Sequence, residues 1–545
     1  MSSEEKARRV FLKATGMGLA AGAFVPGINP LAAKGAAAVE DPKSESQPAA
    51  RLVYDAKAFG AAGDGRAIDS PAINRTIEAA ASAGGGTVYF RTGNYLCYSI
   101  HLRSKVALYL DQGATIIAAD PAADAAHSYD LAESNQPWEG YQDYGHNHWH
   151  NSLIWGERLN GVAIEGPGLI WGKGLSRGWG TGPVAEQAGV ANKAIALKNC
   201  RNVILRDFSI LHGGHFGILA TGVDNLTIDN LKIDTNRDGI DIDCCRNVRV
   251  SNCSVNSPWD DGICLKSSFA LGHARATEMV TIANCLVTGG YEEGTMLDGT
   301  FKEFPQTEKI PRTGRIKFGT ESNGGFKNIA VSNCVFERCN GLAIESVDGA
   351  VIEDVSCTNL TMREMFGPPI FVRLGARLRG PAGIAVGTIR RVMLSHITCV
   401  NAAESPKIAS MLAGITGHPI EDVKISDVII VGPGGGTVAD AQRQIAEKEK
   451  DYPEPNMFGT TPAHGFFVRH MNGLEMNGIK MECAAEDWRP AFVLEDVNGA
   501  AFGTIKIPVV AARPAFVLSN VKDFSVYRSR PLADVDLTAV ERKEF

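Results

Sequence analysis

The sequence has no long apolar run beyond its first 25 residues and no large excess of charge of one sign. The missing apolar run excludes a chain that spans a membrane several times. A formal net charge of −7 leaves no basic face of the kind that a general nucleic-acid binder needs, so no nucleic-acid partner is expected. With 44% apolar and 21% charged residues, the chain is also neither disordered nor collagen-like.

Spacings typical of metal sites are absent as well. The 12 cysteines include no C-x-x-C pair. His146, His148 and His150 alternate and could place three imidazoles on one strand face, but no set of cysteines or carboxylates accompanies them. The sequence therefore predicts no metal ion.

Glycine is abundant. The chain has 59 glycines in 545 residues, which is typical of proteins with many tight turns, such as all-β or repeat architectures. The length alone would suggest three or four domains at about 150 residues each. A repeat in the sequence changes that expectation.

The first 50 residues have the pattern of a processing signal. Arg8 and Arg9 resemble a twin-arginine export motif, and the apolar stretch 14–25 that follows is too short to span a bilayer. We expect residues 1–38 to be removed and residues 39–50 to be a polar linker. This predicts a bacterial protein that is periplasmic or secreted, with no membrane contact in its mature form.

A template N-V-x-I-x-N recurs along the chain. Its clean copies are 23 and 22 residues apart, and each alternates apolar and polar residues as a β-strand does. The Asn at the end of each copy can turn the chain and bond its neighbours above and below. The copies are Asn202–Asp207, Asn225–Asn230, Asn247–Asn252, Met279–Asn284 and Asn328–Asn333.

A repeat of this length cannot bury its apolar face alone, so the copies must stack. The sequence predicts an all-β protein, a single-stranded right-handed parallel β-helix. We expect an N-terminal cap and first coils over residues 51–150 and the β-helix over 151–545. Inserted loops are expected near residues 300–314, 376–389 and 432–465.

The repeat also places cysteines. Cys253, Cys285 and Cys334 each fall six residues after a copy begins, which predicts an inward column of small apolar side chains. The sequence does not decide whether Cys244 or Cys245 forms a disulfide with a neighbouring cysteine.

A column of ionisable side chains follows from the same spacing. Thirteen residues after four successive copies begin lie His215, Asp238, Asp260 and Glu292. Rungs of a β-helix lie about 4.8 Å apart, and carboxylates at that distance repel one another, which lets an acid and a base coexist. Asp261 adds a further carboxylate. Acidic residues that merely cap turns are the alternative interpretation.

Basic residues near this column favour a site for an acidic ligand. Lys266, Arg315 and Lys317 lie in strand-like segments close to it.

Three motifs now resemble a known family. Residues 236–239 (NRDG), 260–267 (DDGICLKS) and 315–317 (RIK) are similar to the N-T-D, D-D and R-I-K signatures of glycoside hydrolase family 28, the polygalacturonases. The resemblance covers roughly residues 51–430 and implies a pectin-lyase-like solenoid. Supporting similarities to pectin-active β-helix enzymes lie at Phe59–Gly65, Gly84–Phe90 and Ile164–Gly168.

The resemblance implies an inverting hydrolysis. Asp260 would protonate the leaving glycosidic oxygen, while Asp238 and Asp261 would activate a water on the opposite face of the sugar. Inverting carboxyl pairs are usually about 6.5–9.5 Å apart. Such a reaction needs two carboxylates and water, so no cofactor is expected.

The resemblance also implies substrate contacts. Arg315 and Lys317 would hold the carboxylate of a uronate, Asn236 and Lys266 would position the ring, and His215 could touch substrate.

The sequence departs from the family where a G-H-G motif is expected. Residues 290–294 read GYEEG, so Glu292 and Glu293 replace the histidine. An acidic group there would repel a galacturonate carboxylate, which favours a neutral sugar such as rhamnose at one subsite. Long inserts that close one end of the groove would favour attack at chain ends.

The expected partner is thus a galacturonan-type polysaccharide or oligosaccharide, and the function is hydrolysis of polygalacturonan or rhamnogalacturonan. Two alternatives stay open. A β-helix polysaccharide lyase would need calcium-binding carboxylates and a basic residue as base. A non-catalytic carbohydrate-binding or structural β-helix could show the same repeats. The sequence leaves the oligomeric state open.

Overall fold

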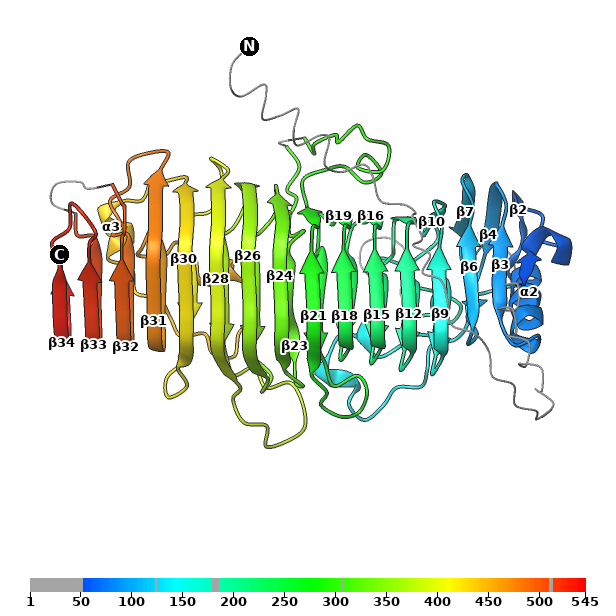
Figure 1. Cartoon of the computed structure of the whole chain (residues 1–545), viewed down its shortest axis with the longest axis horizontal. Coiled ribbons are helices and arrows are strands. Elements are labelled where there is room, and N and C mark those ends of the chain that lie inside the picture. Colours follow the sequence, from blue (N-terminus) through cyan, green and yellow to red (C-terminus); the bar gives the residue numbers. More distant parts are fainter. Residues whose placement is uncertain (1–51, 123–125, 179–185, 306, 509–512) are drawn as a thin grey trace, which may run out of the picture. The chain divides into compact units, whose positions relative to one another are not determined.

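A computed structural model describes residues 52–122, 126–178, 186–305, 307–508 and 513–545. Residues 51–545 form one compact unit built mainly of parallel strands (Figure 1). The predicted export signal and linker, residues 1–38 and 39–50, lie outside the described residues. Within the described ranges, no helix is long and apolar enough to cross a membrane.

The strands form three rows, and each strand pairs in parallel with the strands one coil before and one coil after it in its row. Row one contains β5 (Ile100–His101), β8 (Ile154–Glu157), β11 (Lys193–Lys198), β14 (Phe216–Thr221), β17 (Asp238–Asp243), β20 (Ile263–Ser267), β23 (Ile316–Ser322), β25 (Leu342–Ser346), β27 (Ile370–Leu374) and β29 (Ser410–Ala413).

Row two contains β1 (Val53–Asp55), β3 (Gly86–Phe90), β6 (Val106–Leu110), β9 (Asn160–Glu165), β12 (Arg201–Arg206), β15 (Asp224–Asp229), β18 (Arg246–Ser251) and β21 (Thr277–Ala283). Row three contains β2 (Asp64–Ile68), β4 (Gly93–Cys97), β7 (Ala114–Ala118), β10 (Leu169–Trp171), β13 (Ser209–Leu211), β16 (Lys232–Asp234), β19 (Ser254–Asn256) and β22 (Leu286–Thr288).

Toward the C-terminus the strands of rows two and three join into longer strands. These are β24 (Phe326–Glu337), β26 (Val351–Met365), β28 (Thr388–Asn401) and β30 (Ile420–Gly432). In β31 (Phe466–Cys483), β32 (Phe492–Gly503) and β33 (Phe516–Tyr527) the first residues continue row one. The antiparallel β34 (Val535–Glu544) ends the stack, and helix α2 (Ser70–Ser82) lies at its N-terminal end. The shorter helices are η1 (Ala56–Phe59), η2 (Glu139–Tyr141), η3 (Tyr144–His146), α3 (Val438–Ala441) and η4 (Pro455–Phe458).

This is the right-handed parallel β-helix that the repeat predicts. The N-V-x-I-x-N copies coincide with the row-two strands, and their Val and Ile positions stack inward. One such column runs from Val203 through Leu226, Val248 and Val280 to Ile329, and each member is at most 2% exposed.

The Asn that ends each copy turns the chain, as expected. Asn252, Asn284 and Asn333 adopt left-handed backbone angles, φ 57°, 57° and 55°. The amide of Asn284 donates to Asn252 Oδ1 at 3.3 Å, and that of Asn333 donates to Asn284 Oδ1 at 3.3 Å. This ladder satisfies side-chain polar groups at a corner where the backbone leaves the sheet.

The cysteine column is also present. Cys253, Cys285 and Cys334 are buried, at most 2% exposed, at equivalent positions of successive coils. All 12 cysteines lie in the described part of the chain and are free thiols, so Cys244 and Cys245 form no disulfide there.

The outer face of row one is covered in two places. Trp149 packs with Phe216 and Leu219 over β14, and Ile445 and Phe458 from the segment between β30 and β31 belong to a second apolar cluster. That second cluster covers β25 to β32 through Ala343, Phe371, Met411, Phe467 and Val493. The outer face of β17, β20 and β23 lies between the two covers and carries charged side chains instead.

We predict that the aromatic stack near the C-terminal end supports these last coils. Phe492 is fully buried between Phe466 and Phe516, with ring centroids 5.9 and 4.6 Å away. Phe492→Ala should lower the free energy of unfolding by about 3–5 kcal/mol, because it leaves a cavity where two rings lose their partner. Urea unfolding measures this. Phe301→Ala, at a ring that is 44% exposed, is the matched control and should change stability far less.

Candidate active site

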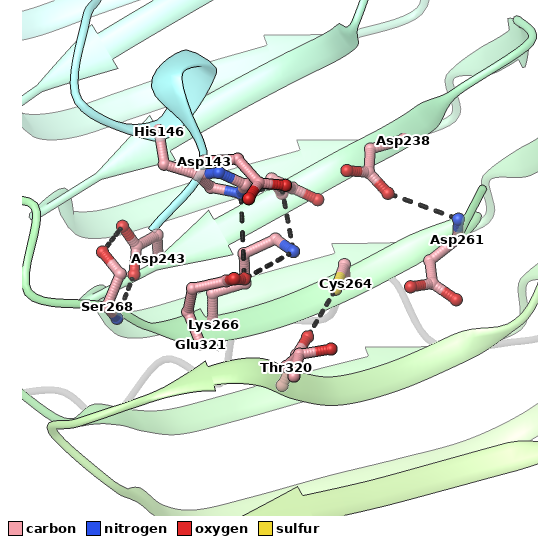
Figure 2. Close-up of polar contacts among 12 residues, drawn as sticks. Asp143, His146, Asp238, Asp243, Asp261, Cys264, Lys266, Ser268, Thr320 and Glu321 are labelled. Carbon is pink, nitrogen blue, oxygen red and sulfur yellow. Dashed lines mark hydrogen bonds and ion pairs between the residues drawn. The ribbon is translucent and has the colours of Figure 1, made fainter. Parts of the chain in front are cut away.

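Three aspartates meet at the turns that lead into β17 and β20. Asp238 is the first residue of β17, and Asp260 and Asp261 precede β20 on the next coil. One carboxylate oxygen from each lies within 4.8 Å of the others, and the backbone N–H of Asp261 donates to Asp238 Oδ1 at 3.3 Å (Figure 2). This part of the predicted column is present, with the oxygens closer together than the usual inverting separation of about 6.5–9.5 Å.

Glycines allow this close approach. Gly239 follows Asp238, and Gly262 follows Asp261. A Cβ atom at Gly239 would lie 2.5 Å from the carbonyl oxygen of Gly262, which no side chain could tolerate. The residue after Asp238 must therefore be glycine for these two turns to stack.

Different neighbours shift the pKa values of Asp238 and Asp261 in opposite directions. Burial, together with Asp241 and Asp260, raises the pKa of Asp238 well above its usual range. Burial also opposes ionisation of Asp261, but Lys317 and Arg315 outweigh it and lower its pKa. Asp238 therefore retains a proton beside the negative charge of Asp261, and acid–base chemistry requires such a pair.

Each of the other two carboxylates has a cation beside it. Arg237 donates from Nε and Nη2 to Asp260 Oδ2 at 3.1 and 3.0 Å. Arg315 Nε donates to Asp261 Oδ1 at 2.8 Å, and Lys317 Nζ lies 3.4 Å from Asp261 Oδ2. The side chain of Asp260 is 26% exposed, whereas Asp238 and Asp261 are each 3% exposed. Asp260 is therefore the carboxylate most accessible from outside.

The column does not continue to Glu292, contrary to the spacing argument. β20 pairs with β23, and the N–H groups of Gly262 and Ile263 both donate to the carbonyl of Arg315. The coil after Asp260 therefore resumes at Arg315, because residues 289–315 are an insertion before β23. A count of residues from the start of the copy cannot detect an insertion inside a turn.

The two glutamates at the G-H-G position have partners elsewhere. Glu292 Oε2 accepts from Lys302 Nζ at 2.7 Å, and Glu293 Oε2 lies 3.0 Å from His212 Nε2 and 3.1 Å from Arg177 Nη2. Each carboxylate thus pairs with a cation, Glu292 with Lys302 and Glu293 with Arg177. Their contact with substrate stays a prediction.

His215 and Asn236 lie close to the aspartates. His215 stacks on Phe216 with ring centroids 4.2 Å apart, and burial lowers its pKa well below the usual value, so it is neutral. It lines a cavity of about 200 Å³ together with Asn192, Arg237, Asp143, Tyr144 and Glu186. Asn236 is 1% exposed, and neither amide atom has a hydrogen-bond partner among the described residues. Both side chains can therefore accept a ligand contact.

Lys266 belongs to a buried charge network farther along the same face (Figure 2). Its Nζ lies 3.3 Å from Glu321 Oε2 and 3.8 Å from Asp241 Oδ2, and His146 Nε2 lies 3.6 Å from Asp241 Oδ2. Arg379 Nη2 lies 2.9 Å from Glu321 Oε1. The network ties the segments carrying His146 and Arg379 to the sheet beneath the aspartates.

Several of these residues were not singled out as site residues from the sequence. Asp241 lies three residues after Asp238, and alternation along β17 indicates that it points outward. Nothing in the sequence brings His146 or Glu321 to the same face as Asp241, because they come from distant segments. Arg237 replaces the threonine of the N-T-D signature, and that substitution was the available signal.

The chemistry of the donor set does not favour a metal ion at the aspartates. Although three carboxylate oxygens lie within 4.8 Å, Arg237, Arg315 and Lys317 already neutralise two of the carboxylates. Glu133, His150 and Glu157 form a second group with suitable distances, but Lys198 lies 3.8 Å from Glu157.

Known families and proteins match this chain over part of its length. Residues 184–304 match the family model for the right handed beta helix region, and residues 53–153 match that for rhamnogalacturonase A/epimerase, pectate lyase-like. A probable polygalacturonase of Vitis vinifera is 22% identical over 327 residues, which is 56% of this chain. The chain spans 60% of that relative's length.

Two solved structures superpose on more of the chain. An exopolygalacturonase of Thermotoga maritima gives a TM-score of 0.58 at 18% identity and covers 79% of this chain and 92% of its own. The fold is that of the polygalacturonases. A family 28 exopolygalacturonase of Yersinia enterocolitica gives 0.58 at 17% identity, covering 84% and 78%. The resemblance found in the motifs is therefore confirmed.

We predict that Glu345 of this polygalacturonase-like β-helix makes stability depend on pH. Glu345 is fully buried, 3.7 Å from Lys317 Nζ, and burial raises its pKa from 4.5 to about 8. The folded protein thus keeps a proton that the unfolded chain releases, and stability falls as pH rises from 4.5 to about 8. Glu345→Gln cannot ionise and should escape this loss.

Thermal unfolding at pH 4 and pH 8 checks this. We compare the melting temperature of Glu345→Gln with that of the wild type at each pH. The variant's melting temperature minus that of the wild type should be about 2 °C or more larger at pH 8 than at pH 4. Glu475→Gln, at a carboxylate that is 65% exposed, should show no such change with pH. An equal shift of Glu345→Gln at both pH values would contradict the assignment.

Proposed function

We propose that the protein hydrolyses glycosidic bonds in a uronate-containing plant polysaccharide of the pectin class. The observation that carries this proposal is the arrangement of Asp238, Asp260 and Asp261 on stacked turns, with oxygens within 4.8 Å and with the pKa raised at Asp238 and lowered at Asp261. The similarity to exopolygalacturonases in fold supports it.

In this proposal Asp260 is the general acid, because it is the most exposed of the three carboxylates and faces the substrate side. Its proton passes to the leaving oxygen as the glycosidic C–O bond breaks. A water bound by Asp238 and Asp261 attacks the anomeric carbon, and Asp261, the member of this pair whose pKa is lowered, takes up the proton that the water loses.

Arg237 links substrate binding to this step. It lines the cavity beside His215 and holds Asp260 through two N–H groups. A uronate carboxylate in the cavity competes with Asp260 for the guanidinium. Substrate binding in the cavity would then draw Arg237 away from Asp260.

The other assignments remain predictions. Asn236, with its unsatisfied amide, is suited to a sugar hydroxyl, and Lys266 would act through its contacts with Asp241 and Glu321 rather than alone. Arg315 and Lys317 are predicted to bind the uronate carboxylate. Both cations already pair with carboxylates of the protein, so a uronate would have to compete with those carboxylates.

We further propose inversion and attack at chain ends. The apolar clusters around Trp149 and Phe458 cover row one on both sides of the aspartates. In this proposal the two covers close the ends of the substrate site. A polymer would then enter by its end.

Export is likewise a proposal. It rests on Arg8 and Arg9 and on the apolar stretch 14–25, which resemble a twin-arginine signal.

Removing either acid–base carboxylate should abolish hydrolysis. Asp260→Asn and Asp238→Asn should each lower kcat by about 10²–10⁴-fold, because proton transfer at either step is lost. Release of reducing ends from galacturonan and rhamnogalacturonan measures this. Asp523→Asn, an exposed site on β33, is the control and should retain full activity. Full activity in Asp260→Asn would exclude the assignment.

The products should distinguish the reaction type. Time-resolved NMR should show monosaccharide or disaccharide from the first turnovers, with the anomeric configuration opposite to that of the cleaved bond. Unsaturated, ultraviolet-absorbing products would indicate a lyase instead. Retained configuration would favour a covalent intermediate, and long oligosaccharides would contradict attack at chain ends.

A further inference from the structure

Glu454 brings a carboxylate from a distant segment to the two basic residues beside the aspartates. It lies between β30 and β31, more than 130 residues after β23. Its Oε1 accepts from Arg315 Nη2 and lies 3.5 Å from Lys317 Nζ. Arg315 therefore contacts a carboxylate on each side, Asp261 through Nε and Glu454 through Nη2.

Charge at this position is balanced within the protein. Arg315 and Lys317 carry two positive charges, and Asp261 and Glu454 carry two negative ones. Glu345, 3.7 Å from Lys317 Nζ, stays mostly protonated at neutral pH because burial raises its pKa to about 8. Arg315 and Lys317 are 1% and 2% exposed, so no uncompensated cation remains for a further anion.

The segment around Glu454 is held at several points. Tyr452 accepts a hydrogen bond from Thr320 Oγ1 at 2.9 Å and lies 3.4 Å from Lys317 Nζ through its hydroxyl. Arg373, which is 2% exposed, donates to the carbonyl groups of Glu447 and Lys448 at 2.7 and 3.2 Å. Phe458 packs in the apolar cluster over row one. The position of Glu454 is thus fixed on both sides along the chain.

We infer that Glu454 occupies the place of a substrate carboxylate, so that the sugar bound next to Asp261 is neutral and the preferred polymer alternates uronate with neutral sugar. This rests on the proposed hydrolase function and specifies its substrate. A uronate at this subsite would place a second carboxylate against the same two cations, and the two anions would repel each other. A ring without a carboxylate meets no such repulsion. The uronate of the pair would lie on the Arg237 side of the aspartates.

The test compares two polymers, a galacturonate homopolymer and one that alternates galacturonate with rhamnose. The wild type should have a kcat/KM about tenfold or more higher on the alternating polymer, and Glu454→Gln should reduce that ratio at least about tenfold by freeing the cations for a uronate. Asp451→Asn is the matched control. It removes the same charge from the same segment, but Asp451 is half-exposed and contacts Lys448. Its ratio should equal that of the wild type.

A readout without turnover supports the comparison. In the Asp260→Asn background, Glu454→Gln should increase affinity for a galacturonate oligomer in calorimetry, whereas Asp451→Asn should not. Should Glu454→Gln fail to fold, Glu454→Asp withdraws the carboxylate while keeping its charge, and a smaller shift in the same direction is expected.

Outcomes for this inference and for the proposed function are distinct. Hydrolysis of both polymers at equal rates by the wild type, or an unchanged ratio in folded Glu454→Gln and Glu454→Asp, would overturn the role of Glu454 and leave the hydrolase intact. No product from either polymer with the wild type would overturn the proposed function itself.

Discussion

Backbone hydrogen bonds between successive coils are the interaction on which the site depends. They hold equivalent residues of neighbouring coils about 4.8 Å apart, whatever the side chains are. Asp238 and the Asp260–Asp261 pair occupy such neighbouring turns, so their carboxylates are brought together at an electrostatic cost that separate loops would relieve by moving apart. Burial of the apolar columns inside the coils supplies the free energy that offsets this electrostatic cost. The column from Val203 to Ile329 is one of them.

The outer face of row one shows how that cost is reduced. Cations reach the carboxylates from three directions. Arg237, on the preceding turn, pairs with Asp260. Arg315 and Lys317, on the next coil, pair with Asp261. Lys266 pairs with the buried carboxylates of Asp241 and Glu321. Asp238 lacks such a partner at hydrogen-bond distance among the described residues, and it is there that the pKa rises. The same arrangement that lets three acids share a small space also makes one of them a proton carrier.

Segments outside the repeat decide what can enter. The stretch before β8 covers β14 with Trp149, and the segment between β30 and β31 covers β25 to β32 and ends in contacts of Tyr452 and Glu454 with β23. The regular coils thus carry the three aspartates, while the irregular segments cover the outer face on both sides of them and bring Glu454 to Arg315. This division agrees with the general behaviour of solenoids, in which insertions project from one face.

Much of this could be predicted from the sequence because a solenoid makes contacts that are local in the repeat. The alternation of Val and Ile, the Asn turns, the column of Cys253, Cys285 and Cys334, and the meeting of Asp238 with Asp260 and Asp261 all follow from aligning the copies of the repeat. The period failed at Glu292, since the insertion at 289–315 moved the next coil to Arg315, and no count along the chain shows where a coil resumes.

The sequence by itself therefore determined the β-helix and the aspartate cluster, because spacing along the chain is spacing between rungs. Only the tertiary structure decided that Glu454 meets Arg315 and Lys317, that His146 joins Asp241, and that both ends of the outer face are covered. The contacts of Glu454 and of His146 join segments more than 90 residues apart. They arise from packing and charge pairing over the folded surface, and no local pattern records them.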